Sequence, residues 1–314
     1  MLNPLKTLIP VSAIIPTYNR SKVLKKTLQT IALQNLQFEE IIIIDASENN
    51  STEEVLSFKY EGLQSRIVFK KAQQKGAAIQ RNEGFVISVH SFVCFMDDDV
   101  YLEPFCIDRL WKGIHENELV GGISAMIINQ QYQPLGKLTK LVCRLLHNEK
   151  LFSYAGKCIG PAYNFLPEDN ENFPEYNHVE WLNLGCTIYR KKALQNPPFQ
   201  NHFIGYSIME DLTLSLTVSK KFILLNARMA KIFHDSQPGD YKDNVILLEK
   251  MELINRHYVM TKILDRTSIK DYLKLILLEV FNLLALFRNF KQLKKVPFFI
   301  LGKLKGIWSI CNIK

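Results

Sequence analysis

The sequence predicts an α/β protein with a doubly wound, mostly parallel sheet, helices on both of its faces and a helical extension at the C-terminus. Three observations lead to this prediction. Over roughly the first 125 residues, apolar runs typical of strands alternate with segments in which apolar residues recur at helical spacing. Several of these runs are continuously apolar, which is typical of strands covered on both faces. From about residue 245 onward the pattern is helical.

The first half of the chain alternates strand and helix signals. Residues 11–16 form an apolar run closed by a proline, and apolar residues keep helical spacing from Ser21 onward. The β-branched run at 41–44 predicts the next strand. Further elements are expected as a helix at 52–60, a strand at 66–70, a helix at 77–88 and a strand at 92–96. This alternation favours a parallel sheet.

Regularity falls after a strand-like segment at 121–126, and residues 128–178 indicate loops and short helices. Another strand is expected at 181–189. Residues 271–287 are too apolar for an ordinary surface helix and too interrupted by polar residues for a membrane span. The expected organisation is one domain at 1–240, with halves at 11–125 and 126–240, and a helical extension at 241–314.

Composition narrows the partners and the compartment. The net charge of +8 indicates an anionic partner, and its lysines crowd the C-terminal region. None of the six cysteines forms a C-x-x-C pair, and several lie in apolar runs, as expected in a reducing compartment. No secretory signal and no long uncharged apolar run is visible. We therefore expect a cytoplasmic protein.

Three consecutive carboxylates, Asp97, Asp98 and Asp99, follow the apolar run at 92–96. The carboxyl end of a strand is where open α/β sheets bind ligands. Adjacent like charges repel one another, and a divalent cation such as Mg²⁺ or Mn²⁺ relieves this repulsion with oxygen ligands. An acidic turn that caps a helix is the alternative interpretation.

Four features at one presumed sheet edge together resemble family 2 glycosyltransferases, which have the fold called GT-A. They are the segment at 16–20, Asp45, the segment at 76–82 and the block at 97–99. The similarity covers roughly residues 11–236. It implies binding of a nucleoside-diphosphate sugar, with Pro16, Thr17, Tyr18, Asp45, Gly76, Arg81, Asp97 and Asp98 as the residues expected to contact this donor.

Individual roles follow from the same resemblance. Thr17 and Asp45 would face a uracil-like base, but the family pattern Asp-Asp-Gly-Ser is reduced here to Asp45-Ala46-Ser47, so thymidine and guanosine donors stay open. Asp45 could instead cap the following helix. Gly76 permits close backbone approach, and Arg81 is expected at the diphosphate. Gly76 could equally be an ordinary turn residue.

The resemblance also implies a metal site and a catalytic base. Asp97, Asp99 and His234 would hold Mg²⁺ or Mn²⁺, and His234 could instead be a surface or core partner of other groups. Asp211, in the pair Glu210-Asp211 at a predicted helix start, would be the general base. A paired acid at this position is also good helix-capping chemistry.

The predicted function is inverting transfer of a sugar, with UDP-sugars favoured as donors, to a glycan or lipid-linked acceptor in cell-surface polysaccharide synthesis. A metal-dependent nucleotidyl- or phosphotransferase is the alternative, as is a non-catalytic membrane-binding protein of the same fold. Lys303 and Lys305 beside apolar residues such as 298–301 favour contact with an anionic membrane surface over nucleic acid. A helical hairpin packed on the catalytic domain is the other interpretation of the C-terminal region.

Overall fold

The computed structural model describes residues 6–149, 151–203, 205–237, 244–287 and 290–312. The chain folds into two compact units. The sheet unit comprises Met1–Tyr132 and Leu166–Gln237, and the helical unit comprises Gln133–Phe165 and Pro238–Lys314. The expected boundary at residue 240 lies outside the described residues. Residues 133–165, which the sequence assigned to the acceptor-side half, pack with the C-terminal helices.

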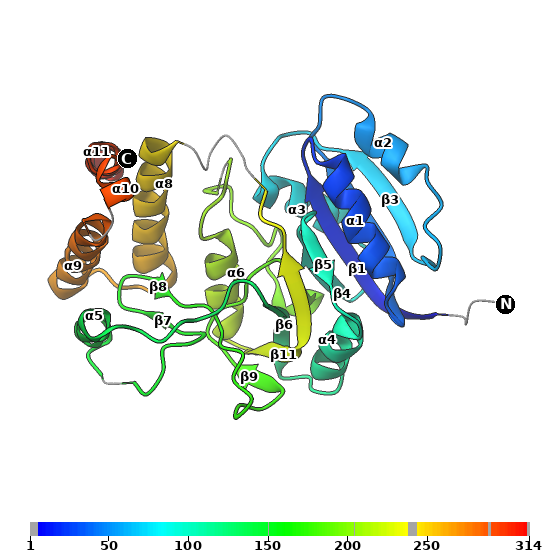
Figure 1. Ribbon diagram of the computed structural model, residues 1–314, viewed down its shortest axis with the longest axis horizontal. Helices are drawn as coiled ribbons and strands as arrows, with labels where there is room; N and C mark the ends of the chain where they lie inside the picture. The colour runs from blue at the N-terminus through cyan, green and yellow to red at the C-terminus, as the bar shows by residue number, and fades with distance from the viewer. Residues whose placement is uncertain (1–5, 150, 204, 238–243, 288–289, 313–314) are drawn as a thin grey trace. The chain divides into compact units, whose positions relative to one another are not determined.

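A nine-stranded mixed sheet forms the centre of the sheet unit, with strand order β3-β2-β1-β4-β10-β6-β11-β5 and β9 paired to β11 (Figure 1). Parallel pairing joins β1 to β2 and β4, β2 to β3, and β6 to β11, whereas β10, β5 and β9 run antiparallel to their neighbours. The strands are β1 Thr7–Thr17, β2 Leu36–Asp45, β3 Arg66–Lys71, β4 Phe92–Met96, β5 Val100–Leu102, β6 Val120–Ile127, β9 Tyr176–His178, β10 Cys186–Arg190 and β11 Ile223–His234.

Helices cover both faces of this sheet, as the continuous apolar runs predicted. On one face, α1 (Ser21–Ala32), α2 (Ser51–Leu56) and α4 (Cys106–His115) share a core with alternate residues of β1 and β2. On the other face, α3 (Ala77–Ile87) lies so close to β1 that a Cβ on Gly84 would meet the Ile14 side chain at 2.4 Å. Tyr189 contacts Ser215 of α6 (Glu210–Ser219) on the same face.

Several parts of the sheet unit differ from the sequence-based expectation. The strand expected at 181–189 begins only at Cys186. The preceding residues form a turn, in which Asn183 accepts from the Gly185 amide and Gly185 accepts from the Asp97 amide. Local hydrogen bonds of this kind compete with a strand ladder. Helix α4 and strands β5, β9 and β11 were not expected from the sequence.

The described part of the helical unit contains four longer helices and a small two-stranded sheet. Leu253, Met260 and Leu275 are buried together in its interior. Within the described residues, no helix is both long and apolar enough to cross a membrane. The elements are α5 Lys137–His147, β7 Cys158–Ile159, β8 Tyr163–Asn164, α8 Val245–Tyr258, α9 Ile269–Leu286, α10 Phe290–Leu293 and α11 Val296–Asn312, with a π-helical turn at Val259–Ile263.

A network of five charged side chains ties α8, α9 and α11 together. Lys303 lies 2.9 Å from Glu249, 3.2 Å from Glu252 and 2.8 Å from Glu279. Arg256 pairs with Glu252 and Glu279 and donates to the carbonyl of Ala162. Lys303 and Arg256 are both buried. Lys303 therefore faces inward, and does not contribute to the basic surface for which the sequence suggested it.

Candidate active site

The acidic block lies where the sequence placed it, at the carboxyl end of a central strand. All five residues of β4 are buried, and Asp97 to Asp99 follow directly. The three carboxylates nevertheless meet different surroundings. The Asp97 side chain is 27% exposed, whereas those of Asp98 and Asp99 are only 5% exposed. The block therefore presents Asp97 to solvent and turns Asp98 inward.

Asp98 fastens the loop after β1 to the acidic block. Its carboxylate accepts a hydrogen bond of 2.6 Å from the Thr17 hydroxyl and lies 3.3 Å from Arg20. Its carbonyl accepts from Thr27 of α1 at 2.7 Å. Burial raises the pKa of Asp98 to about 7, although Thr17 and Arg20 oppose this. Thr17 and Asp98 were both expected at the donor, and here they bond to each other in the interior.

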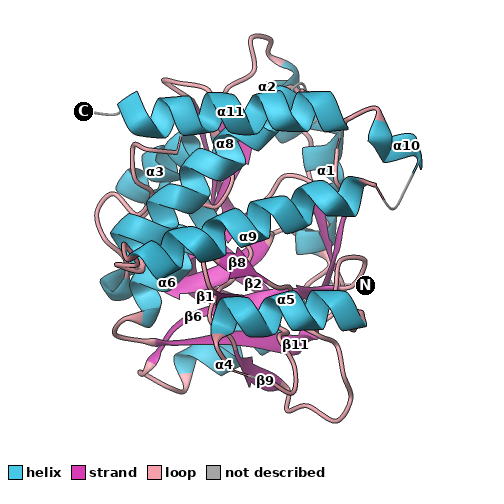
Figure 2. Ribbon diagram, turned by 90° about the vertical axis from the view of Figure 1, so that its left-hand side faces the viewer, coloured by secondary structure: helices cyan, strands magenta, loops and turns pink. Residues whose placement is uncertain are grey.

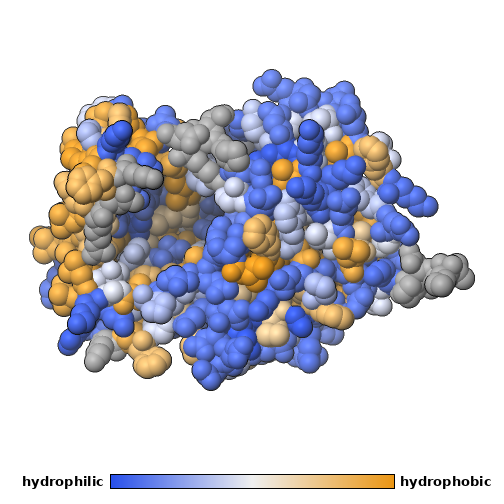
Figure 3. Space-filling view, in the orientation of Figure 1, coloured by the Kyte–Doolittle hydropathy of each residue, from blue (hydrophilic) through white to orange (hydrophobic). Residues whose placement is uncertain are grey.

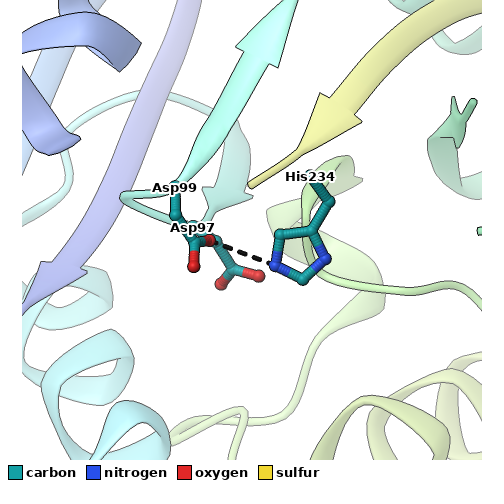
Figure 4. Close-up of side chains that lie close together, drawn as sticks. All are labelled: Asp97, Asp99 and His234. Atoms are coloured by element: carbon teal, nitrogen blue, oxygen red, sulfur yellow. Dashed lines mark ion pairs between the residues drawn. The ribbon is translucent and has the colours of Figure 1, made fainter. Parts of the chain in front are cut away.

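Asp97, Asp99 and His234 form a cluster in which one ligand atom from each residue lies within 4.8 Å of the others (Figure 4). Nε2 of His234 is 3.1 Å from an Asp99 oxygen. Two carboxylate oxygens and an imidazole nitrogen form a donor set suited to Mn²⁺, and its oxygen-rich character also suits Mg²⁺. These three side chains therefore fit the divalent ion that the sequence predicted.

Neighbouring groups orient this cluster. The side-chain amide of Gln130 lies 3.2 Å from Nδ1 of His234, so the Nε2 atom is directed toward Asp99. Burial acts to raise the pKa of Asp99, but the hydrogen bond and charge of His234, together with Arg20, lower it below its usual value. Asp99 is therefore ionised and ready to bind a cation.

Arg81 joins the acidic block to the Glu210-Asp211 pair. One terminal nitrogen of its guanidinium lies 2.6 Å from Asp97 and the other 3.0 Å from Glu210. Its side chain is only 4% exposed, and its Nε has no hydrogen-bond partner among the described residues. The sequence expected Arg81 at the diphosphate. In this structure its fork is instead engaged by two carboxylates that lie 113 residues apart.

Glu210 and Asp211 occupy the first turn of α6. Burial raises the pKa of Asp211 to about 6. Burial and the neighbouring Asp211 raise the pKa of Glu210 to about 8, against the opposing effect of Arg81. A carboxylate with a pKa near 6 is ionised at neutral pH and more basic than an ordinary aspartate, which suits a proton acceptor.

The loop before α3 supports the same edge of the sheet. Gly76 has φ +149°, which other residues rarely adopt, and its ideal Cβ position is 3.6 Å from the amide of Gly205. Gln80 on the first turn of α3 donates to the carbonyls of Thr17 and Ile44 at 3.0 and 2.7 Å. Gln80 therefore holds together the ends of β1 and β2.

Asp45 does not face an open space in this arrangement. It is fully buried, and its two oxygens accept from the Ser47 amide at 2.9 Å and from Lys71 at 2.9 Å. Lys71 also donates to the carbonyl of Asn49. Asp45 thus closes its own loop and does not cap the following helix, because α2 begins only at Ser51 with Asn50 as its N-cap. Tyr18, which was expected to contact the donor, carries Lys75 over its ring at 3.5 Å. Pro16 lies buried in β1.

Sequence reasoning did not assign roles to several residues of the site. Arg20 and Gln80 lie within segments that it singled out, so their polar character beside a strand end was an available signal. Gln130 lies in a segment interpreted as loop, and no local pattern marks it. Glu210 was noted only as the neighbour of Asp211. Its contact with Arg81 depends on the fold and not on spacing.

Comparison of the sequence with known protein families identifies the family to which the chain belongs. The sequence model described as glycosyl transferase family 2 matches residues 12–196, which is more than half of the chain. The protein belongs to glycosyltransferase family 2. It is therefore an enzyme that transfers sugars, and the resemblance drawn from the motifs is confirmed. This membership rules against the non-catalytic interpretation of the sequence.

One curated relative matches along almost the whole chain. The GalNAc(5)-diNAcBac-PP-undecaprenol beta-1,3-glucosyltransferase of Campylobacter jejuni is 22% identical over 298 residues, covering 92% of this chain and 87% of that protein. Other relatives match less of their length. The chain spans only 15% of the glycosyltransferase GlyA of Streptococcus pneumoniae, at 26% identity over 106 residues and 34% of this chain.

The solved structures agree with the predicted fold. A mannosyltransferase from Pyrobaculum calidifontis, solved with GDP-Man and Mn²⁺, has a TM-score of 0.54 at 12% identity and covers 96% of this chain and 87% of its own. GalNAc-T7, solved with UDP, GalNAc and Mn²⁺, has a TM-score of 0.52 at 12% identity, covering 83% and 53%. The GT-A fold with C-terminal helices is thereby confirmed.

Proposed function

We propose that this glycosyltransferase moves a sugar from a nucleoside-diphosphate donor, with UDP-sugars favoured, to a hydroxyl group of a glycan or lipid-linked acceptor, and that it inverts the anomeric configuration. The observation that carries the proposal is the convergence of Asp97, Asp99 and His234 on one point. Arg81 links this point to the Glu210-Asp211 pair. One site thus combines side chains that can hold a divalent ion, which would neutralise a diphosphate, with a carboxylate that can act as a base.

Each side chain has a distinct task in this proposal. A divalent ion held by Asp97, Asp99 and His234 would supply the positive charge that stabilises a departing diphosphate. Asp211 accepts the proton of the acceptor hydroxyl as its oxygen attacks the anomeric carbon opposite the leaving group. Arg81 fixes the positions of Asp97 and Glu210 relative to each other. It thereby positions the metal ligands on one side and the base, Asp211, on the other.

The acceptor and the pathway are proposed from one relative. The Campylobacter protein is named for a PP-undecaprenol acceptor, and it matches this chain almost from end to end. We accordingly propose a glycan or lipid-linked acceptor in cell-surface polysaccharide synthesis at the cytoplasmic face of the membrane. The pairing of Asp45 with Lys71 means that Asp45 does not by itself distinguish one donor base from another.

The test is transfer itself. Purified protein is incubated with Mn²⁺, lipid-linked and glycan acceptors, and UDP-, GDP- or dTDP-sugars, and the released products are identified. The proposal expects a nucleoside diphosphate and a product whose anomeric configuration, read by NMR, is opposite to that of the donor. Release of pyrophosphate would instead indicate nucleotidyl transfer and overturn the proposal.

A matched pair of variants tests the base. Asp211→Asn is expected to lower the turnover number by about 10³-fold while donor binding, measured by calorimetry, stays within a few-fold of wild type. Asp108→Asn is the control, because Asp108 also lies in the first turn of a helix, α4. It is expected to leave turnover unchanged. Equal activity of the Asp211 variant and wild type would remove Asp211 from this role.

A further inference from the structure

The helical unit carries most of the large apolar side chains that are exposed in the described part of the chain. Soluble proteins rarely expose a large continuous apolar patch unless it binds something. Figure 3 shows these side chains gathered over the region of α9 and α11. The surface that the helices of this unit share is therefore a candidate binding surface.

Helix α9 directs an apolar stripe outward. Its exposed apolar residues recur every three or four positions along the helix, which places them on one side. They are Ile269, Leu273, Ile276, Val280, Leu284 and Phe287. Leu275 and Leu278, on the opposite side, are buried. Helix α9 therefore has two apolar sides, one packed inside the unit and the other facing outward.

Helices α11 and α5 repeat this arrangement. Phe298, Leu301, Leu304 and Trp308 are exposed on α11, and Trp308 reaches 70% exposure. On α5 the exposed apolar residues likewise recur at helical spacing, as Leu138, Leu141 and Leu145. Figure 2 shows α11, α9 and α5 lying one above another with similar directions. Their outward stripes together form what is here called the outer face.

Acidic side chains are scarce on the helices that form the outer face, although Glu149 after α5 and Asp265 before α9 are exposed. Helices α5, α10 and α11 contain no aspartate or glutamate. Glu249, Glu252 and Glu279 are drawn into the network around Lys303 and Arg256. In α9 this leaves Asp271 as the other acid, and it is used in the capping box with Ser268.

Basic side chains remain exposed beside the outer face. They are Lys137, Lys140 and Arg144 on α5, Lys270 on α9, and Lys294, Lys295 and Lys305 at and before α11. An apolar surface with a cationic border, and with no acid in α5 or α11, is complementary to an anionic lipid bilayer, which offers acyl chains and negative headgroups. Protein interfaces, by contrast, are depleted in lysine.

We infer that the outer face of α5, α9 and α11 binds the surface of an anionic bilayer, with its apolar stripes entering the headgroup region and its lysines at the phosphates. This deepens the proposed function, because it names the surface on which a lipid-linked acceptor would be met. Lipid binding requires neither donor nor acceptor, so the two proposals can fail separately.

The test is flotation of the full-length protein with vesicles of phosphatidylcholine, either alone or mixed with phosphatidylglycerol. We expect recovery with the anionic vesicles, weaker recovery with neutral ones, and loss of binding as salt is raised. Leu273→Ser and Leu284→Ser should each weaken partitioning by roughly tenfold. Leu33→Ser, at an exposed apolar residue of the sheet unit, is the control and should bind as wild type does.

A lysine pair tests the electrostatic part. Neutralising Lys294 and Lys295 to glutamine should weaken binding to anionic vesicles by roughly 25-fold, because each lysine near such a surface is worth roughly fivefold. The same change at Lys220 and Lys221, an exposed pair in the sheet unit, should have no effect. Circular dichroism verifies that each variant is folded.

Two results would overturn the inference. One is equal and negligible recovery with both kinds of vesicle. The other is a concentration-dependent dimer in sedimentation, weakened by Leu273→Ser without any flotation, which would assign the outer face to a second copy of the chain.

Discussion

The two units of this glycosyltransferase place their carboxylates in opposite ways. In the sheet unit, Asp97 and Asp99 gather at the end of a strand, and Asp97 stays in reach of solvent. In the helical unit, Glu252 and Glu279 turn inward, where Lys303 and Arg256 compensate them. Carboxylates that converge on one point beside a histidine can bind a cation, whereas carboxylates that are neutralised inside leave an apolar and basic exterior.

This difference separates the roles of similar residues. Burial raises the pKa of Asp211 to about 6, which prepares it to accept a proton. Glu252 is partly buried, which also acts to raise its pKa, but Arg256 and Lys303 outweigh that effect and lower the pKa to about 2. A carboxylate can therefore accept a proton near neutral pH in the sheet unit, whereas in the helical unit it stays ionised and serves only to stabilise the fold.

The largest expected effect is at the carboxylates of the cluster with His234. Asp99→Asn should reduce transfer by about 10³-fold or more, because it removes a charged ligand and the partner of His234. Steady-state rates measured over a Mn²⁺ titration would check this. Asp169→Asn is the control, since it removes an ion-paired carboxylate of the same unit without touching the cluster. Equal losses in both variants would contradict a specific role of Asp99.

The next effect concerns the neutralised carboxylates. Lys303→Met should lower the free energy of unfolding by about 3 kcal/mol, because it leaves three partly buried carboxylates with only Arg256. Lys305→Met, two residues further on and exposed, should change it by less than about 0.5 kcal/mol. Urea unfolding of both variants measures the difference. Similar values would show that the network does not stabilise the helical unit.

Arg81 is expected to give a smaller effect on catalysis. Arg81→Lys keeps the positive charge but loses the planar fork that contacts Asp97 and Glu210 together. We expect the turnover number to fall by about 10- to 100-fold, with less change in the affinity for the nucleoside diphosphate. A loss confined to donor affinity would indicate that Arg81 contacts the diphosphate, as the sequence first suggested.

The smallest effect is the dependence of transfer on pH. Because the pKa of Asp211 is raised to about 6, the base becomes protonated as the pH falls through this value. At saturating Mn²⁺ and donor, turnover should fall about tenfold for each pH unit below about 6. Calorimetric Mn²⁺ binding at the same pH values separates this loss from protonation of the metal ligands. A profile that stays flat down to pH 5 would contradict the assignment.

Much of the fold could be predicted from the sequence, because each strand signal is local. The run at 41–44 and the alternation with helices sufficed for the order of elements up to β4, and the block at 97–99 marked the edge that carries the site. His234 could be placed beside this block only through the family resemblance. Its position depends on the antiparallel pairing of β11 with β5, which sets His234 opposite Val100, the residue directly after the block.

The remaining features depend on contacts between distant segments. No spacing predicts that Lys71 neutralises Asp45, that Thr17 bonds to Asp98 or that Arg81 reaches Glu210. Each pairing arises because the fold buries a carboxylate, which then requires a partner nearby. The inward position of Lys303 has the same origin, since a helical pattern does not tell which face of the helix is packed.

The proposed metal site is best tested by the thermal stability of the protein against UDP, GDP, dTDP and CDP, each with and without Mn²⁺, for the wild type and Asp99→Asn. A nucleotide at a hundred times its dissociation constant stabilises the folded state by about 2.7 kcal/mol. We expect one diphosphate to raise the melting temperature only when Mn²⁺ is present, and only in the wild type. Stabilisation that is equal without metal, or equal in the variant, would contradict a metal site at Asp97, Asp99 and His234.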